Sequence, residues 1–362
     1  MSSAKQLTAN AFELSKNDRL LKFLESQGIS DPQIEALTPD ASTRNYFRIP
    51  WKKRKAVAAV YPDPFDPDLH PYLDVTRLFL QNDIAVPEVY AVDGQMGIIV
   101  QEDLGDRQLC HVYETASDSE TDDYKERAIS LIARIQKATE RAHEAKSISS
   151  RLAFDEAKLS WELDFFVEHY FQSLRGENLR HAEAAELKTE LNDVAAELAA
   201  VPRVLCHRDF HTANLMLDEN NHLRVVDHQD ARMGPASYDL VSFLLDRQPV
   251  PPSLAEIRDH RLFFLEERRR LGLEALDPDE FARQFRLMTI QRGLKAVGTF
   301  SYQTGVCKRG AFYEHFINPT LLIVLQAAEW LERFPALRQM INDRLQGKRR
   351  LDEVNTSELP LN

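Results

Sequence analysis

The sequence has few cysteines, no long apolar run and no excess of basic residues. Its three cysteines, Cys110, Cys206 and Cys307, lie far apart, so neither a disulfide framework nor a cysteine metal site is expected, and a reducing cytoplasm fits best. No run approaches the roughly 20 apolar residues of a membrane-spanning helix, and Met1 to Asn10 contain no stretch typical of a signal peptide. These absences predict a soluble, cytoplasmic protein with no membrane partner.

The charge balance is acidic. The chain has 45 basic residues (Lys and Arg) against 57 acidic ones (Asp and Glu), a formal net charge of -12, which argues against broad nucleic-acid binding. Hydrophobic residues make up 43% and charged residues 28%, as in ordinary globular proteins. The length of 362 residues suits two lobes. No oligomeric state is predicted.

The hydrophobic pattern changes near residue 105. Before it, short apolar segments and amphipathic stretches predict strands at 46–49, 56–60 and 96–100 and helices at 17–27 and 72–81. Beyond it, helical periodicity prevails, at roughly 124–145, 155–175, 180–200, 255–272, 278–300 and 320–346. One hairpin, with strands at 215–217 and 223–226, interrupts these helices. The pattern predicts an α+β protein.

The segment from His207 to Asn214 reads H-R-D-F-H-T-A-N, which matches the kinase catalytic-loop pattern H-R-D-x-x-x-x-N. Asp227 follows at the far end of the predicted hairpin, which can bring its carboxylate towards the Asn214 amide. Amide and carboxylate oxygens beside nucleotide phosphates suit Mg²⁺. The pattern therefore predicts ATP as cosubstrate, a Mg²⁺ site at Asn214 and Asp227, and Asp209 as the base that orients an attacking hydroxyl. The alternative is that the two aspartates cap turns and Asn214 adopts a left-handed conformation.

Three further residues are expected to support this loop. In the kinase pattern His207 and Arg208 brace the loop rather than react. Asp239 follows a Gly-Pro turn and either caps a helix or braces the loop. We assign all three a supporting role.

The catalytic loop, together with residues 225–231 and 234–240, resembles the aminoglycoside phosphotransferase superfamily. Residues 40–48 and 291–298 resemble those of bacterial N-acetylmuramate/N-acetylglucosamine kinases, which phosphorylate amino sugars at the anomeric hydroxyl. The resemblance implies a bilobal protein-kinase-like fold, with a small mixed β-sheet N-lobe and a mostly helical C-lobe. It implies a nucleotide-binding lobe at 1–103, a catalytic and substrate-binding lobe at 104–346 and a frayed polar tail at 347–362.

The nucleotide residues rest on the same resemblance. Ser42, Thr43 and Arg44 lie in a turn between two strands that could contact phosphates, although a plain hairpin turn is the alternative. Glu102 and Leu104 occupy the position where kinases present backbone groups to adenine, or form an ordinary linker. The sequence departs from the kinase pattern in one respect: the expected strand 57–60 contains no phosphate-binding lysine. The sugar kinases that the chain resembles often lack this lysine as well. Arg44 is the candidate for the missing positive charge. His228 replaces a commonly aromatic residue.

For the acceptor, Gln291, Arg292 and Lys295 can share one helical face, which would suit the carboxylate of N-acetylmuramate. Ion pairs with acidic neighbours are the alternative reading. Glu162 lies on a stripe with Trp161, Phe165 and Phe166, which is typical of either a sugar pocket or a core.

The predicted function is an ATP-dependent amino-sugar kinase with a small-molecule partner. An aminoglycoside kinase, whose cationic acceptor calls for an acidic site, is the alternative enzyme. A nucleotide-binding pseudokinase is the alternative of another class.

Overall fold

The computed structural model describes residues 15–37, 44–247 and 251–345. The chain forms two compact units. The first comprises Met1–Thr121, Glu140–Ser149 and Thr212–Ala231, and the second comprises Asp122–Thr139, Ser150–His211 and Arg232–Asn362. Predictions for residues 1–10, for Ser42 and Thr43, and for the tail at 347–362 lie outside the described residues. The lobe boundary between residues 103 and 104 stays a prediction.

The first unit contains a five-stranded antiparallel sheet in the order β1-β2-β3-β5-β4. Its strands are β1 (Glu35–Leu37), β2 (Asn45–Trp51), β3 (Arg54–Val60), β4 (Val89–Asp93) and β5 (Ile98–Glu102). The strands expected at 46–49 and 56–60 form a hairpin, in which Trp51 pairs with Arg54 across a turn where Lys52 has a φ of 54°. β1 and β4 were not predicted, because both are short and lack a clear alternation.

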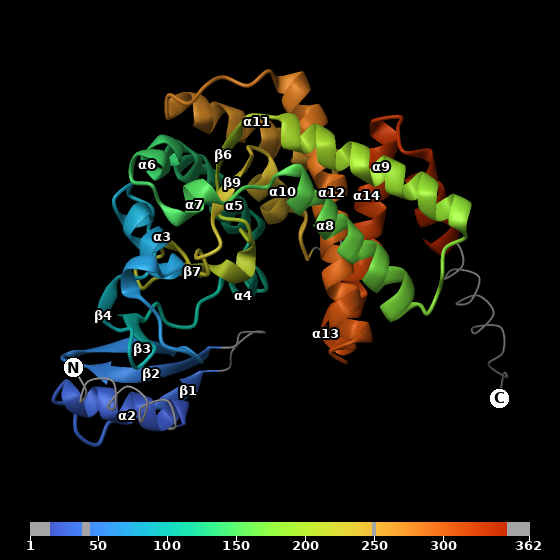
Figure 1. The fold of residues 1–362 in the computed structure, drawn as a ribbon. Coiled ribbons are helices and arrows are strands. Elements are labelled where there is room, and N and C mark those ends of the chain that lie inside the picture. The colour runs from blue at the N-terminus through green and yellow to red at the C-terminus, as the bar shows by residue number, and fades with distance from the viewer. Residues whose placement is uncertain (1–14, 38–43, 248–250, 346–362) are drawn as a thin grey trace, which may run out of the picture. The chain divides into compact units, whose positions relative to one another are not determined.

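Helix α2 (Lys16–Ser26) covers one face of this sheet (Figure 1). The Ser15 side chain caps the helix by accepting a hydrogen bond from the backbone N–H of Asp18 at 3.2 Å. Every second residue of β2 is buried, and the ring of Trp51 stacks on Phe23 of α2 with 6.1 Å between centroids. The apolar face of α2 and the buried face of β2 therefore pack together in one apolar layer.

Helix α3 (Pro71–Leu80) packs on another part of this sheet, where Tyr72 and Leu73 contact Ile99 of β5. The helix predicted at 72–81 is thereby confirmed to within one residue. The remaining helical segments of the first unit are short: η1 (Pro67–Leu69), α4 (Leu109–Tyr113), α6 (Thr139–Glu144) and η3 (Thr212–Asn214).

The predicted second hairpin is also present in the first unit. Its strands β7 (Leu215–Leu217) and β8 (Leu223–Val225) pair antiparallel, with Leu215 opposite Val225. The Asp218 carboxylate accepts hydrogen bonds from the backbone N–H groups of Asn220 and His222, both at 2.9 Å. This Asx arrangement fixes the turn and therefore the register of the two strands.

The second unit is mostly helical, with one two-stranded sheet formed by β6 (Arg203–Cys206) and β9 (Arg232–Pro235). Helix α12, 28 residues long, packs against α8, α9, α10 and α14. The helices of this part of the chain are α5 (Asp118–Lys137), α7 (Ile148–Arg151), α8 (Glu156–Val167), η2 (Glu168–Leu174), α9 (His181–Ala200), α10 (Tyr238–Leu245), α11 (Leu254–Arg270), α12 (Pro278–Gly305), α13 (Gly310–Tyr313), η4 (Glu314–Phe316) and α14 (Ile317–Trp330). The α+β class is confirmed.

Three predicted helices are interrupted. The helix expected at 320–346 ends at Trp330, and a separate helix covers 335–345, because Glu332 and Phe334 have positive φ values and Pro335 follows them. The helix expected at 124–145 divides into α5 and α6. The one expected at 155–175 changes from α-helix to π-helix after Val167. Periodicity alone does not reveal such breaks.

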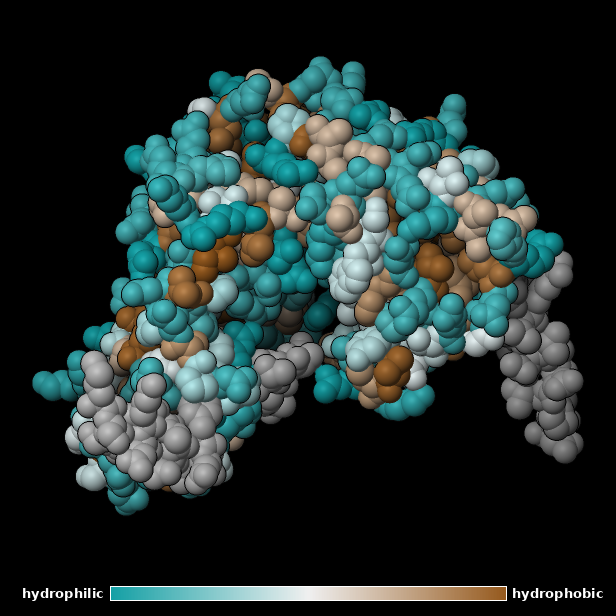
Figure 2. Space-filling view, viewed as in Figure 1, coloured by the Kyte–Doolittle hydropathy of each residue, from teal (hydrophilic) through white to brown (hydrophobic). Residues whose placement is uncertain are grey.

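Hydrophilic residues cover most of the face shown in Figure 2, and hydrophobic side chains form small separate groups. Among residues 15–37, 44–247 and 251–345, no helix combines the length and the apolar character needed to cross a membrane.

The contact between α12 and α8 predicts a stability effect. A methyl group at Gly298 would lie 2.8 Å from the Cα and 3.0 Å from the N of Phe166. We expect Gly298→Ala to lower the free energy of unfolding by about 1–3 kcal/mol through overpacking, against a helix-propensity gain of only about 1 kcal/mol. Urea denaturation measures this. Gln284→Ala, at a partly exposed position of α12, is the control and should change the free energy of unfolding by less than about 0.5 kcal/mol. A Gly298→Ala variant as stable as the unmodified protein would contradict the prediction.

Candidate active site

The loop after β6 is held by a buried carboxylate. Asp239, in the first turn of α10, accepts hydrogen bonds from the backbone N–H groups of His207 (2.6 Å) and Arg208 (3.0 Å). Burial raises the pKa of Asp239, although the His207 and Arg208 groups favour its charged form. Arg208 has a φ of 88°, a left-handed conformation that is rare for a residue with a side chain. These contacts fix the backbone immediately before Asp209.

Asp209 is surrounded by cations. Its carboxylate lies 3.5 Å from Lys295 Nζ, 3.7 Å from Arg208 Nε and 3.8 Å from Arg292 Nη1. Burial opposes the negative charge, but Lys295, Arg208 and Arg292 outweigh it and hold the pKa of Asp209 well below its usual range. The side chain is 26% exposed. Asp209 is therefore an ionised, reachable carboxylate that can accept a hydrogen bond from a hydroxyl group.

Arg292 is buried, and its guanidinium donates hydrogen bonds to the catalytic loop and to α10. Nη1 donates to the backbone carbonyl of Arg208 (3.0 Å) and to the Tyr238 hydroxyl (2.8 Å), and Nη2 donates to Ser242 Oγ (2.8 Å) and to Asp246. The predicted basic face is thus divided: both residues lie near Asp209, but Lys295 is partly exposed, whereas Arg292 is buried and joins α12 to α10 and the loop.

Asn214 and Asp227 lie at the same end of the β7–β8 hairpin. The Val226 N–H donates to the Asn214 carbonyl at 3.0 Å, one step beyond the Leu215–Val225 pair. Asp227 has a φ of 62°, and its side chain is 44% exposed. These two residues are brought together as the sequence predicted, within the first unit. Their predicted meeting with Asp209 stays a prediction.

The donor chemistry at this hairpin end suits magnesium. An exposed carboxylate and a neighbouring amide are hard oxygen ligands, and Mg²⁺ completes its shell with phosphate oxygens and water. In the described part of the chain, no group of three or more His, Cys, Asp or Glu side chains could hold a metal ion. Asn214 and Asp227 are therefore residues that could hold a metal ion together with nucleotide phosphates.

Arg44 is the cation next to Asp227. Its Nη2 lies 3.6 Å from Asp227 Oδ1, and its guanidinium carbon lies 5.7 Å from the ring centroids of both Tyr46 and Tyr61. Burial, followed by the charge of Arg44, lowers the pKa of His70 to about 4. Arg44 therefore places the positive charge near the hairpin end.

Strand β3 carries its only lysine, Lys55, at its exposed beginning, and the residues from Ala56 to Val60 are all buried and apolar. The buried part of β3 therefore contains no lysine, as the sequence indicated. Lys55 instead lines a cavity of about 600 Å³ in the first unit, which Glu102 and Leu104 also line.

Glu102 is the last residue of β5 rather than part of the segment after it. Its N–H donates to the Glu88 carbonyl at 2.8 Å, and its carboxylate pairs with Arg224. The adenine role of Glu102 and Leu104 stays a prediction. His228, the other departure, is buried between Tyr72 and Phe79 and contacts the Thr76 hydroxyl at 2.7 Å, so its ring packs as an aromatic one would.

Two of the predicted acceptor residues bind each other. The Gln291 amide of α12 donates to the Glu162 carboxylate of α8 at 2.9 Å, and both side chains are buried. Lys158 Nζ lies 3.8 Å from Glu162 and 3.9 Å from the centroid of the Trp161 ring, which is 55% exposed. Of the predicted aromatic stripe, Phe166 belongs to the core, whereas Trp161 does not.

A family model described as "Phosphotransferase enzyme family" matches residues 33–272. The chain belongs to this family. The predictions of a phosphotransferase and of its superfamily are thereby confirmed.

Two curated relatives are each named "N-acetylmuramate/N-acetylglucosamine kinase". The one from Neisseria meningitidis serogroup B is 29% identical over 84% of this chain and 89% of its own length. The one from Pseudomonas aeruginosa is 31% identical over 72% of this chain and 74% of its own length. The structure of choline kinase from Streptococcus pneumoniae is 14% identical, with a TM-score of 0.56, and covers 87% of this chain and 100% of that chain. This likeness supports the kinase-like fold alone.

The H-R-D-x-x-x-x-N motif did not reveal every residue that surrounds the catalytic loop. Asp246 and Tyr238, which bind Arg292, were missed because they are brought to it only by tertiary folding. Lys158 was also missed, although its position four residues before Glu162 on one helix could have indicated the pair. His211, whose N–H donates to the Asp209 carbonyl at 3.1 Å, lies within the motif but carries no role in it.

The charges around Asp209 predict a titration effect. We expect Lys295→Met to raise the pKa of Asp209, because Lys295 is the strongest of the cations that lower it. An NMR titration of the Asp209 carboxyl carbon, assigned by comparison with Asp209→Asn, measures this. Since the folded-state pKa is depressed, ionised Asp209 stabilises the fold at neutral pH and this contribution is lost as the pH falls, so the variant should retain less of it.

The control is Lys188→Met, which removes a lysine paired with Asp164 on the surface. It should leave the Asp209 titration unchanged. An unchanged pKa in Lys295→Met would contradict the assigned electrostatics.

Proposed function

We propose that the protein is an ATP-dependent sugar kinase that transfers the γ-phosphoryl group to the anomeric hydroxyl of N-acetylmuramate or N-acetylglucosamine. The observation that carries the proposal is the similarity, over most of the chain, to relatives named N-acetylmuramate/N-acetylglucosamine kinase. The ionised carboxylate of Asp209 in an H-R-D-x-x-x-x-N loop supports it chemically.

In this proposal Asp209 accepts a hydrogen bond from the anomeric hydroxyl and turns its oxygen towards the γ-phosphorus of ATP. As the new O–P bond forms, the bond to the β-γ bridging oxygen breaks, ADP leaves with the electron pair, and Asp209 takes the hydroxyl proton late. A carboxylate with a low pKa is a weak base, so its main contribution is orientation. Asp239 and Arg292 hold the loop backbone on either side of Arg208.

Asn214 and Asp227 are proposed to hold Mg²⁺, which would offset the charge of the phosphates. Arg44 supplies a further positive charge beside Asp227, in place of the strand lysine. Ser42 and Thr43 are proposed phosphate contacts that lie outside the described residues. Glu102 and Leu104 are proposed to lie at the adenine.

For the acceptor, the Glu162–Gln291 pair offers a carboxylate and an amide, the groups that hydrogen-bond sugar hydroxyls. The exposed face of Trp161 suits stacking on a sugar ring. Lys295 remains the candidate for an acceptor carboxylate, whereas Arg292, whose Nη1 and Nη2 atoms already donate to its own chain, fits loop positioning better.

The charge of the second unit near Asp209 disfavours an aminoglycoside acceptor. Lys158, Arg208, Arg292 and Lys295 lie near one another there, as their effects on the pKa values of Asp209 and Lys158 indicate. Cationic acceptors require an acidic site, so this cluster favours a neutral or anionic sugar. The complete Asp209, Asn214 and Asp227 set counts against a pseudokinase.

The roles proposed for Asp209 and Asp227 predict different defects, one in turnover and one in nucleotide binding. We expect Asp209→Asn to bind ATP with Mg²⁺ normally but to lose about a hundredfold or more in kcat, because it removes the base. Asp227→Ala should instead weaken nucleotide binding in the presence of Mg²⁺. Transfer of labelled γ-phosphate to N-acetylmuramate and N-acetylglucosamine, together with calorimetric ATP titrations, measures both.

Asp164→Asn is the matched control, since this aspartate pairs with Lys188 at the surface of α8. It should leave both quantities unchanged. Transfer to neither amino sugar by the unmodified protein would refute the proposed substrate, and unimpaired turnover in Asp209→Asn would refute the proposed base.

The acceptor role of Glu162 predicts a selective effect. Glu162→Gln is nearly isosteric but loses the charged acceptor, so we expect the KM for the sugar to rise about tenfold, the value of one charge-assisted hydrogen bond. The KM for ATP should stay the same. Steady-state kinetics with each substrate varied separately measures this, and equal changes in both KM values would point to a structural role instead.

A further inference from the structure

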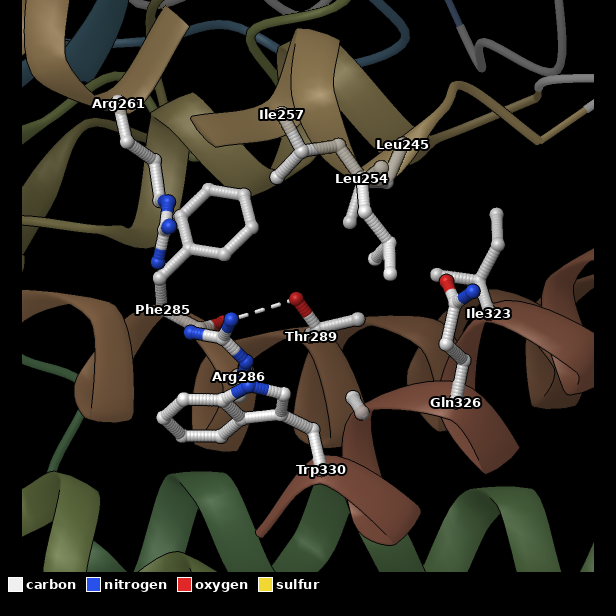
Figure 3. Close-up of a pocket in the computed structure, with 11 residues that line it drawn as sticks. Leu245, Leu254, Ile257, Arg261, Phe285, Arg286, Thr289, Ile323, Gln326 and Trp330 are labelled. Carbon is white, nitrogen blue, oxygen red and sulfur yellow. Dashed lines mark hydrogen bonds between the residues drawn. The ribbon is translucent and has the colours of Figure 1, made fainter. Parts of the chain in front are cut away.

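The second unit contains a pocket of about 60 Å³ between α11, α12 and α14 (Figure 3). Its apolar lining includes Leu245, Leu254, Ile257, Phe285, Ile323 and Trp330. Two of these side chains remain accessible, Leu254 at 55% and Trp330 at 52% exposure, so the pocket can be reached from solvent. Apolar walls alone would not indicate a ligand.

Arg261 of α11 contributes a buried cation to this pocket. It is only 9% exposed, and its Nε and Nη1 atoms have no hydrogen-bond partner among the described residues. Its guanidinium carbon lies 5.6 Å from the centroid of the Phe285 ring (Figure 3). Buried N–H groups of a charged side chain are normally paired, so this arrangement calls for an acceptor.

Arg286 of α12 contributes a second cation. Its guanidinium carbon lies 3.3 Å from the centroid of the Trp330 ring, and its Nη1 donates to the Ala282 carbonyl at 2.8 Å. Burial, followed by the charge of Arg261, lowers the pKa of Arg286 to about 10. The charge of Arg261 thus disfavours the charged form of Arg286, and both arginines line one pocket.

Within residues 15–37, 44–247 and 251–345, neither guanidinium forms an ion pair with a carboxylate. The acidic side chains of α11 are engaged elsewhere: Glu266 pairs with Arg269, and Glu267 pairs with Arg270. An anion in the pocket would satisfy the free N–H groups of Arg261 and reduce its repulsion with Arg286.

We propose that this pocket binds a small organic carboxylate whose compact apolar body fills the space between the aliphatic side chains. The carboxylate lies against Arg261 and Arg286, and the apolar body lies against Leu245, Ile257 and Ile323. The pocket volume of about 60 Å³ restricts the body to about two or three carbon atoms, since a cavity of about 150 Å³ encloses benzene, which has six. This site is separate from the residues of the proposed reaction and does not depend on the proposed function.

The test uses the full chain and two isosteric probes, propanoate and the uncharged propanamide. Isothermal titration calorimetry should show saturable binding of the carboxylate, and about tenfold weaker binding of the amide, since the amide lacks one charge-assisted contact. Arg261→Gln and Arg286→Gln should each weaken carboxylate binding about tenfold. Arg269→Gln, which removes an exposed arginine of the same helix, should leave it unchanged.

Thermal unfolding without ligand distinguishes a ligand-binding arginine from a structural one. Removing an unpaired buried charge should leave the melting temperature of Arg261→Gln equal to or above that of the unmodified protein. The proposal is overturned if the carboxylate shows no saturable binding, if the amide binds equally well, or if both arginine variants retain full affinity. A marked fall in the melting temperature of Arg261→Gln would also contradict it, because this residue would then stabilise the fold by itself.

Discussion

The conformation of the catalytic loop depends on the hydrogen bonds that the buried carboxylate of Asp239 accepts. This carboxylate binds the two backbone N–H groups that precede Asp209, and Arg292 binds the carbonyl of Arg208 on the other side. The loop backbone is thus fixed by a negative and a positive side chain, both buried, in surroundings where such hydrogen bonds are strong. The left-handed Arg208 can persist because these contacts over-determine it.

The sequence predicted those parts of the site that depend on local spacing. The H-R-D-x-x-x-x-N motif and the hairpin pattern were sufficient to place Asn214 and Asp227 at the same end of the hairpin, because the buried apolar residues and the turn set its register. The partners of Arg292 could not be predicted, since Tyr238 and Asp246 reach it only through the packing of α10 against α12. Helix ends were predicted poorly where positive φ values interrupt an apolar period.

The chain is acidic overall, yet its second unit gathers cations in two places. Arg292 and Lys295 lie beside Asp209 on one part of α12, and Arg286 lies on another part of the same helix beside Arg261. Net charge describes long-range attraction, whereas recognition of a small anion depends on a few desolvated groups. A net charge of -12 is therefore compatible with the binding of anionic small molecules.

The apolar interior of β3 has a practical consequence. Here the positions from Ala56 to Val60 offer no amine, and the positive charge beside Asp227 belongs to a guanidinium, Arg44, which resists acylation. An acylating reagent carried by a nucleotide-like group would therefore meet no amine on β3 beyond Lys55 at its exposed beginning.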